Sequence, residues 1–139
     1  MKKPVKIALS VIFIIALIGV IGALYMFNKG HKDLSKVNPD FVITSTDLVK
    51  EFEKDEAAAT AKYMNKIVEV IGPVHYLKVE ENKATSVTLQ TGNAASLVIC
   101  SFSTGIDPEK FDVDKMSTIR GEFSGFLMDI LLNNCVLIK

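Results

Sequence analysis

Hydrophobic residues form one long run near the start of the chain. Of the 21 residues from 7 to 27, 18 are apolar, and the exceptions are Ser10, Gly19 and Gly22. About 20 apolar residues in a helix cross the hydrocarbon core of a bilayer, where a chain must satisfy its own backbone hydrogen bonds. The run therefore predicts a transmembrane helix over residues 7–27.

A cleaved signal peptide is the alternative interpretation of this run. The apolar region of a signal peptide is usually about 7–15 residues long and ends at a site of small residues. The run here is longer, and Val20 and Gly22 offer only a weak cleavage site. We therefore favour an uncleaved signal anchor, which makes the protein a single-pass membrane protein.

The charges beside the run bear on its orientation. Three lysines lie on each side of it, Lys2, Lys3 and Lys6 before it and Lys29, Lys32 and Lys36 after it. The positive-inside count is therefore equal, and only the free α-amino group favours the first side. A six-residue tail before one span and a folded domain usually leaves the domain outside. We expect residues 1–6 in the cytoplasm and the domain outside it, in the periplasm or at the cell surface.

The polar residues 28–43 predict a linker, and a helical pattern follows them. From residue 45 to residue 64, apolar side chains recur on one stripe, formed by Leu48, Phe52, Ala59 and Tyr63. Thr44 followed by Asp47 fits the start of a capped helix. We therefore expect one helix at the start of a domain that spans residues 44–139.

The hydrophobic period changes to two after Lys66, which is typical of strands. Val, Ile and Phe alternate with polar residues in five segments: 67–79, 86–91, 95–103, 116–127 and 130–138. In the first segment the pattern places Tyr76 on the core face and His75 on the opposite face. Gly72 and Pro73 predict a bulge or bend there, because proline cannot donate a ladder hydrogen bond.

Five strands, a bent first strand and a longer connection after the third predict a mainly β fold. A small five-stranded Greek-key barrel preceded by one α-helix fits this order, because closure leaves no exposed edge strand. A sandwich with few strands is the structural alternative.

The charge of the chain changes the functional picture. The 16 basic and 16 acidic residues balance, but the first three lysines precede the apolar run, so 13 basic and 16 acidic residues follow it. The segment 66–139 holds seven basic and nine acidic residues. Phosphate binding needs local positive charge, so we expect no nucleic-acid partner. Phosphate-loop, HExxH and CxxC motifs are absent from the sequence, and we expect no enzyme, cofactor or metal site.

Several segments together resemble a known family. They are YMNKIVEVIGPVHYL, SLVICSF, IRGEFSGF and LLNNCVLIK, with DEAAATAKY before them. Over residues 45–139 this pattern is similar to the bacterial tRNA-anti-like family. The resemblance implies an OB-fold, often behind a membrane anchor or signal. It implies no established activity and no functional residues.

The two cysteines lie in strands that are neighbours in an OB barrel. Cys100 is in the third predicted strand and Cys135 in the fifth. In an oxidising compartment they would form a disulfide, which is the interpretation we favour for an outer domain. Two buried free thiols are the alternative.

An OB barrel usually binds its ligand across its second and third strands. The second strand offers Thr88 and Gln90, and the third offers Ser101. The sequence thus predicts a non-catalytic, membrane-anchored OB-fold module that binds a protein partner or an envelope component. An oligonucleotide- or oligosaccharide-binding protein is the alternative.

Overall fold

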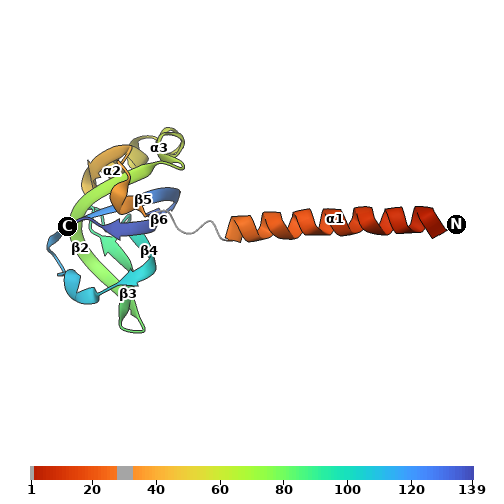
Figure 1. Cartoon of the computed structure of the whole chain (residues 1–139). Helices are drawn as coiled ribbons and strands as arrows, with labels where there is room; N and C mark the ends of the chain where they lie inside the picture. The colour runs from red at the N-terminus through yellow and green to blue at the C-terminus, as the bar shows by residue number, and fades with distance from the viewer. Residues whose placement is uncertain (1, 28–32) are drawn as a thin grey trace. The chain divides into compact units, whose positions relative to one another are not determined.

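The computed structural model describes residues 2–27 and 33–139 of the 139-residue chain. The chain divides after His31 into two compact units. The first unit is the helix α1, Lys2–Phe27, and the second is the β-rich domain (Figure 1).

The helix α1 carries three lysines in its first turns and is apolar beyond them. Its segment Lys3–Phe27 has 25 residues and contains an 18-residue stretch with a mean hydropathy of 3.0, and its large apolar side chains are exposed. The hydroxyl of Ser10 donates a hydrogen bond to the Lys6 carbonyl, at 2.8 Å. By its length and composition the helix can span a membrane, as the sequence predicts.

The domain is a closed five-stranded barrel, which confirms the predicted fold. Its strands are β2 (Ile67–Glu80), β3 (Lys83–Leu89), β4 (Val98–Ile106), β5 (Met116–Leu127) and β6 (Asp129–Leu137). They pair in the order β2-β3-β4-β6-β5, and pairing of β2 with β5 closes the barrel. This is the order of an OB-fold and excludes the sandwich. A short 3₁₀ turn, η2 (Pro108–Lys110), lies in the connection from β4 to β5.

Strand β2 bends so that its two halves have different partners. Residues 67–73 pair with β5, and residues from Val74 onward pair with β3. Pro73 lies at the change of partner, as expected for a residue without an N–H to donate. The Gln90 N–H donates to the Pro73 carbonyl across this bend, at 2.8 Å.

Gly72 has a different role from the predicted bulge, because the register shifts of β2 come later, after Val74 and after Lys78. A Cβ atom at Gly72 would lie 2.2 Å from the Oγ of Ser45. Ser45 is buried, and its hydroxyl donates to the Gln90 carbonyl. Glycine is therefore required here by close packing of the helix layer on β2.

Two helices replace the single predicted helix. They are α2 (Ser45–Lys54) and α3 (Glu56–Tyr63), and they are separated by Asp55, whose backbone is extended. The Asp55 carboxylate accepts from the Ala58 N–H at 3.0 Å, so it caps the second helix. The predicted apolar stripe is buried in the core of the domain. Thr44 caps α2 by accepting from the Asp47 N–H at 3.2 Å, as predicted.

Part of the predicted linker, residues 28–43, belongs to the domain. Residues 28–32 lie outside the described residues, but η1 (Leu34–Lys36) and the strand β1 (Phe41–Thr44) are ordered elements of the domain. Strand β1 pairs with β2 in parallel, and the Leu34 side chain is buried. The predicted boundary at residue 44 is therefore about ten residues too late.

An arginine from a distant strand holds this early segment. Arg120 of β5 donates through Nη1 to the carbonyls of Leu34, at 2.9 Å, and Val37, at 2.7 Å. Its Nη2 lies 2.6 Å from the carboxylate of Glu69 on β2, and both side chains are mostly buried. The local sequence does not reveal the hydrogen bonds to Leu34 and Val37, because both residues are more than 80 positions from Arg120.

Candidate ligand-binding surface of the barrel

A β-bulge turns Tyr76 outward. The register of β2 against β3 shifts between Val74 and Tyr76, so His75 is the extra residue. An extra residue reverses the alternation of side chains. Val74 is buried, whereas Tyr76 is 60% exposed. The predicted core position of Tyr76 is therefore wrong, and the outward position of His75 is correct.

Tyr76 begins a row of side chains that crosses four strands. It lies opposite Thr88 of β3, which lies opposite Ile99 of β4, which lies opposite Leu131 of β6. A second row contains Lys78, Ser86 and Ser101. We call these seven residues the outer face. On β3, β4 and β6 they alternate with the core residues Val87, Leu89, Val98, Cys100, Ile130 and Leu132.

The structure brings together two of the three predicted ligand residues. Thr88 and Ser101 both belong to the outer face. Gln90 lies beyond the end of β3, and its side-chain amide donates to the Asp114 carboxylate at 2.7 Å. With His75 it lines a separate hollow of about 320 Å³ beside the loop 91–94. Gln90 thus holds a loop and is not part of the outer face.

A larger hollow, the hairpin pocket, continues the outer face toward the β2–β3 turn. Ser86 pairs with Ser101, but Ala84 pairs with Ile106, so residues 102–105 of β4 oppose the single residue Thr85. The extra residues form a bulge between the two strands, and β4 ends three residues beyond its predicted end. Gly105 lies in the bulge with φ +61°, a conformation that suits glycine.

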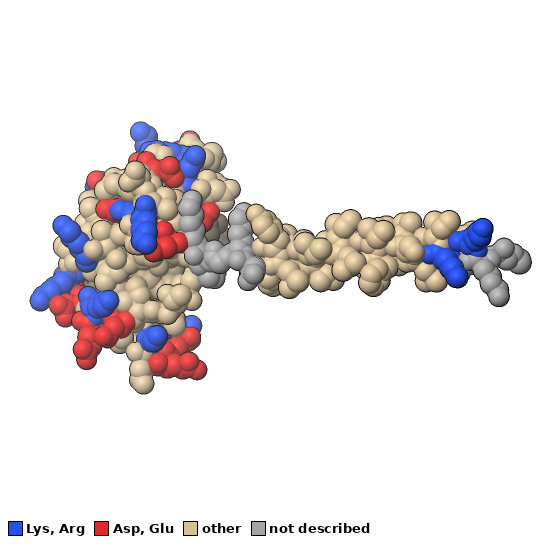
Figure 2. Space-filling view, in the orientation of Figure 1, with Lys and Arg blue, Asp and Glu red and all other residues tan. Residues whose placement is uncertain are grey.

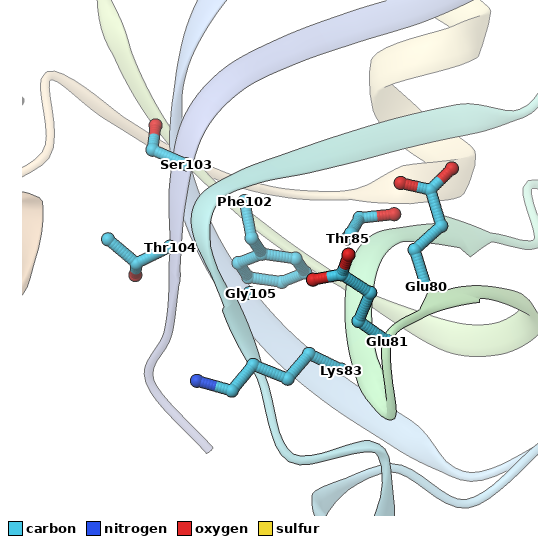
Figure 3. A pocket seen from close by; sticks show the side chains of 8 residues that line it. All are labelled: Glu80, Glu81, Lys83, Thr85, Phe102, Ser103, Thr104 and Gly105. Atoms are coloured by element: carbon cyan, nitrogen blue, oxygen red, sulfur yellow. The ribbon is translucent and has the colours of Figure 1, made fainter.

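The hairpin pocket has a volume of about 620 Å³ and mixed polar and aromatic walls. Its lining residues are Glu80, Glu81, Lys83, Thr85, Phe102, Ser103, Thr104 and Gly105 (Figure 3). Glu81 and Asn82 both have positive φ, as a two-residue hairpin turn requires. In Figure 3 the ring of Phe102 lies at the centre of the lining side chains, and its other contacts include the Phe111 ring, 5.9 Å away. The pocket thus combines an aromatic floor with polar walls.

Charges on this end of the barrel are largely paired. Lys78 lies 3.0 Å from Glu80, and the pocket adds Glu81 and Lys83, so its lining has one more acidic than basic residue. Acidic atoms gather at the bottom of the domain in Figure 2 with basic atoms beside them, where Figure 1 shows the β2–β3 turn and the connection from β4 to β5. Elsewhere on this view Lys and Arg atoms are interspersed with Asp and Glu atoms. The described residues on this view present no extended basic surface.

The family of the chain follows from comparison with known proteins. The model of the tRNA_anti-like family matches residues 1–137. The chain belongs to the tRNA_anti-like family. No curated protein matches it.

One solved structure shares the fold of this tRNA_anti-like protein, and a second resembles it only distantly. A lipoprotein from Klebsiella pneumoniae subsp. pneumoniae, named as a candidate nucleic acid-binding protein, is 22% identical with a TM-score of 0.54. The match covers 70% of this chain and 91% of that one. A DUF3299 family protein from Pseudomonas aeruginosa is 10% identical with a TM-score of 0.39, over 67% of this chain and 80% of that one. At these identities the first likeness shows the fold alone, and the second is too distant to support an argument.

The two cysteines of the tRNA_anti-like barrel are buried free thiols in the structure. Cys100 lies opposite Leu132 on the neighbouring strand, and the Cys135 thiol donates to the Leu132 carbonyl at 3.4 Å. Burial and an interaction with the Cys100 thiol raise the pKa of Cys135 well above its usual value. The structure thus places both thiols together inside the barrel without the predicted bond, and the disulfide stays a prediction.

Metal ligation has no candidate in the described part of this tRNA_anti-like chain. Among residues 2–27 and 33–139, no group of three or more His, Cys, Asp or Glu residues could hold a metal ion.

Proposed function

We propose that this protein is a non-catalytic, membrane-anchored binding module whose barrel lies outside the cytoplasm. In this proposal α1 anchors the chain, and the domain binds a protein partner or another component of the cell envelope through the outer face. The observation that carries the proposal is the position of Tyr76. A bulge turns this side chain outward, so that it is 60% exposed, and it begins the row of side chains that crosses four strands. Tyrosine is enriched in interfaces because it combines a large apolar ring with a polar end.

The anchor and the location have their own support. A helix of 25 residues that contains an 18-residue stretch with a mean hydropathy of 3.0 fits a membrane span. The structural neighbour from Klebsiella pneumoniae is named a lipoprotein, which is consistent with an exported domain. Mass spectrometry of the protein from its native membranes tests the anchor: we expect an intact N-terminus, and a mature chain that begins near residue 23 would reject it.

A nucleic-acid partner has weaker support than an envelope component. The neighbour's name suggests such a partner, but the chain after residue 27 has 13 basic against 16 acidic residues. Two further basic residues of the barrel are held by carboxylates: Lys115 lies 3.5 Å from Asp112, and Arg120 lies 2.6 Å from Glu69. With the Lys78–Glu80 pair, three of the seven basic residues of segment 66–139 are held by carboxylates, which leaves four to neutralise the phosphates that supply most non-specific affinity.

Affinity capture of the full-length protein from its own membranes tests the proposed function. The wild type, a Tyr76→Ser variant and a Val42→Ser variant are compared, because Tyr76 and Val42 are 60% and 59% exposed on different parts of the domain. We expect a component that the wild type and Val42→Ser retain and Tyr76→Ser loses. Equal recovery with all three proteins, or recovery of nothing, would contradict a binding role for the outer face.

A further inference from the structure

We propose that the hairpin pocket binds a neutral saccharide. This inference rests on the proposed function, because the pocket continues the outer face at the Ser86–Ser101 pair. It goes further by naming the chemical class of the ligand and the residues that would hold it.

The size and construction of the pocket suit a small ligand or one end of a chain. Its volume of about 620 Å³ lies within the range of about 300–1,000 Å³ that is usual for ligand pockets. The pocket exists because four residues of β4 oppose one residue of β3, and not because a side chain has moved aside. The Lys83 stem lies against Gly105, where an added Cβ would be 3.0 Å from the Lys83 Cβ. The backbone therefore preforms the pocket, which lowers the entropic cost of binding.

The lining offers both kinds of hydrogen-bonding partner that a polyol needs. The Glu81 carboxylate accepts, the Lys83 ammonium donates, and the hydroxyl of Thr104 does both. The Thr85 hydroxyl donates to the Lys78 carbonyl at 3.3 Å, which leaves its oxygen able to accept. Sugar hydroxyls donate and accept in turn, so they match this mixture better than a purely anionic or purely apolar ligand does.

The floor and the charge of the pocket narrow the ligand class. Phe102 belongs to the core and is 7% exposed, so at the floor it offers the C–H side of a sugar ring a small apolar contact and not an open aromatic face. Glu80 is paired with Lys78, and Glu81 balances Lys83, so the pocket offers no excess of positive charge to bind a phosphate or carboxylate group. A lipid chain would need an apolar lining, whereas seven of the eight lining residues are polar, charged or glycine. A neutral saccharide satisfies all three conditions.

The test measures saccharide binding to the full-length protein in lipid nanodiscs, which avoids sugar-based detergents. Cellohexaose, maltohexaose and chitohexaose are titrated by calorimetry, and a single-stranded oligonucleotide is titrated in parallel. Glu81→Gln keeps the size of the side chain but removes its charge, and Glu109→Gln is the matched control on an exposed residue outside the pocket. We expect at least one hexasaccharide to bind, with affinity about tenfold lower for Glu81→Gln, because the hydrogen-bond acceptor at this position then carries no charge.

The outcomes separate this inference from the proposed function. Saccharide binding that Glu81→Gln weakens and Glu109→Gln leaves unchanged supports the pocket. Binding of none of the three saccharides, equal binding by both variants, or preference for the oligonucleotide would overturn it. Loss of a captured component with Tyr76→Ser is scored independently, so the outer face can remain a binding surface even if the pocket takes no saccharide.

Discussion

The two halves of β2 differ although they belong to one strand. From Ile67 to Val74, buried and half-buried residues alternate strictly, and the strand is held by β1 on one side and β5 on the other. From His75 to Glu80 there are two register shifts, only Leu77 is half-buried, and the strand is paired with β3. The first half fixes the barrel and its early segment, and the second half presents Tyr76 and leads to the hairpin pocket.

Under the proposed function, this difference assigns stability to the first half of the strand and recognition to the second. Regular alternation buries every second side chain, so each residue of the first half has a packing role. A bulge costs a ladder hydrogen bond but redirects a side chain, and bulges are frequent beside functional sites. We therefore expect substitutions in the first half to change stability and substitutions in the second half to change binding.

Gly72→Ala should have the largest effect on stability. The new Cβ would lie 2.2 Å from the Ser45 Oγ and would break its buried hydrogen bond to the Gln90 carbonyl. Overpacking and the unsatisfied hydroxyl together should lower the free energy of unfolding by roughly 3–5 kcal/mol. Thermal unfolding followed by circular dichroism measures this. Gly125→Ala is the control, because a Cβ there meets no atom within 4 Å; equal effects of the two variants would contradict the packing role of Gly72.

Reduction of a disulfide between Cys100 and Cys135 should have the next largest effect on stability. Protein purified from its native compartment without reductant should show no free thiol after unfolding if Cys100 and Cys135 form the predicted bond. The bond would close a loop of about 36 residues, and reduction should then lower stability by roughly 3–4 kcal/mol.

Two titratable thiols per chain would reject the disulfide and weaken the case for an oxidising location. In that case the raised pKa of Cys135 predicts little thiolate at pH 7. Alkylation of the folded protein should then be slow and should accelerate as the pH rises toward that pKa.

Glu69→Ala tests the clamp that joins the first half of β2 to the early segment. The variant leaves Arg120 without its carboxylate partner while its bonds to the Leu34 and Val37 carbonyls remain. Because the pair is mostly but not fully buried, we expect a loss of about 2–3 kcal/mol, below the range for a fully buried pair. Asp112→Ala, which breaks an exposed pair with Lys115, should cost no more than about 1 kcal/mol. A loss for Glu69→Ala as small as that of Asp112→Ala would show that the clamp does not hold the segment.

Tyr76→Ser should have the smallest effect on stability. The side chain is 60% exposed and is not a member of the hydrophobic core, so we expect a change of at most about 0.5 kcal/mol. A loss above 2 kcal/mol in thermal unfolding would assign Tyr76 to the structural half of the strand and would remove the distinction between the halves.

The sequence predicts the barrel well and its surface less well. Alternation over residues 116–127 gives β5 its observed bounds, and the apolar stripe gives the buried side of α2 and α3. The predicted core position of Tyr76 is wrong because a bulge in the pairing of β2 with β3 shifts the alternation of side chains by one residue. The predicted linker ends too late because Arg120 and Glu69, far along the chain, hold residues 34–37. These two errors and the place of Gln90 depend on contacts between separate segments of the chain, and a single sequence does not state which residues meet.

Photo-crosslinking in native membranes tests the central claim most directly. A benzophenone amino acid replaces Tyr76 in one full-length variant and Val42 in another, at sites of equal exposure beside the two halves of β2. If the second half of β2 is the recognition surface, irradiation gives a crosslinked species from position 76 and none from position 42. Crosslinks from position 42 alone, or equally from both positions, would contradict the account.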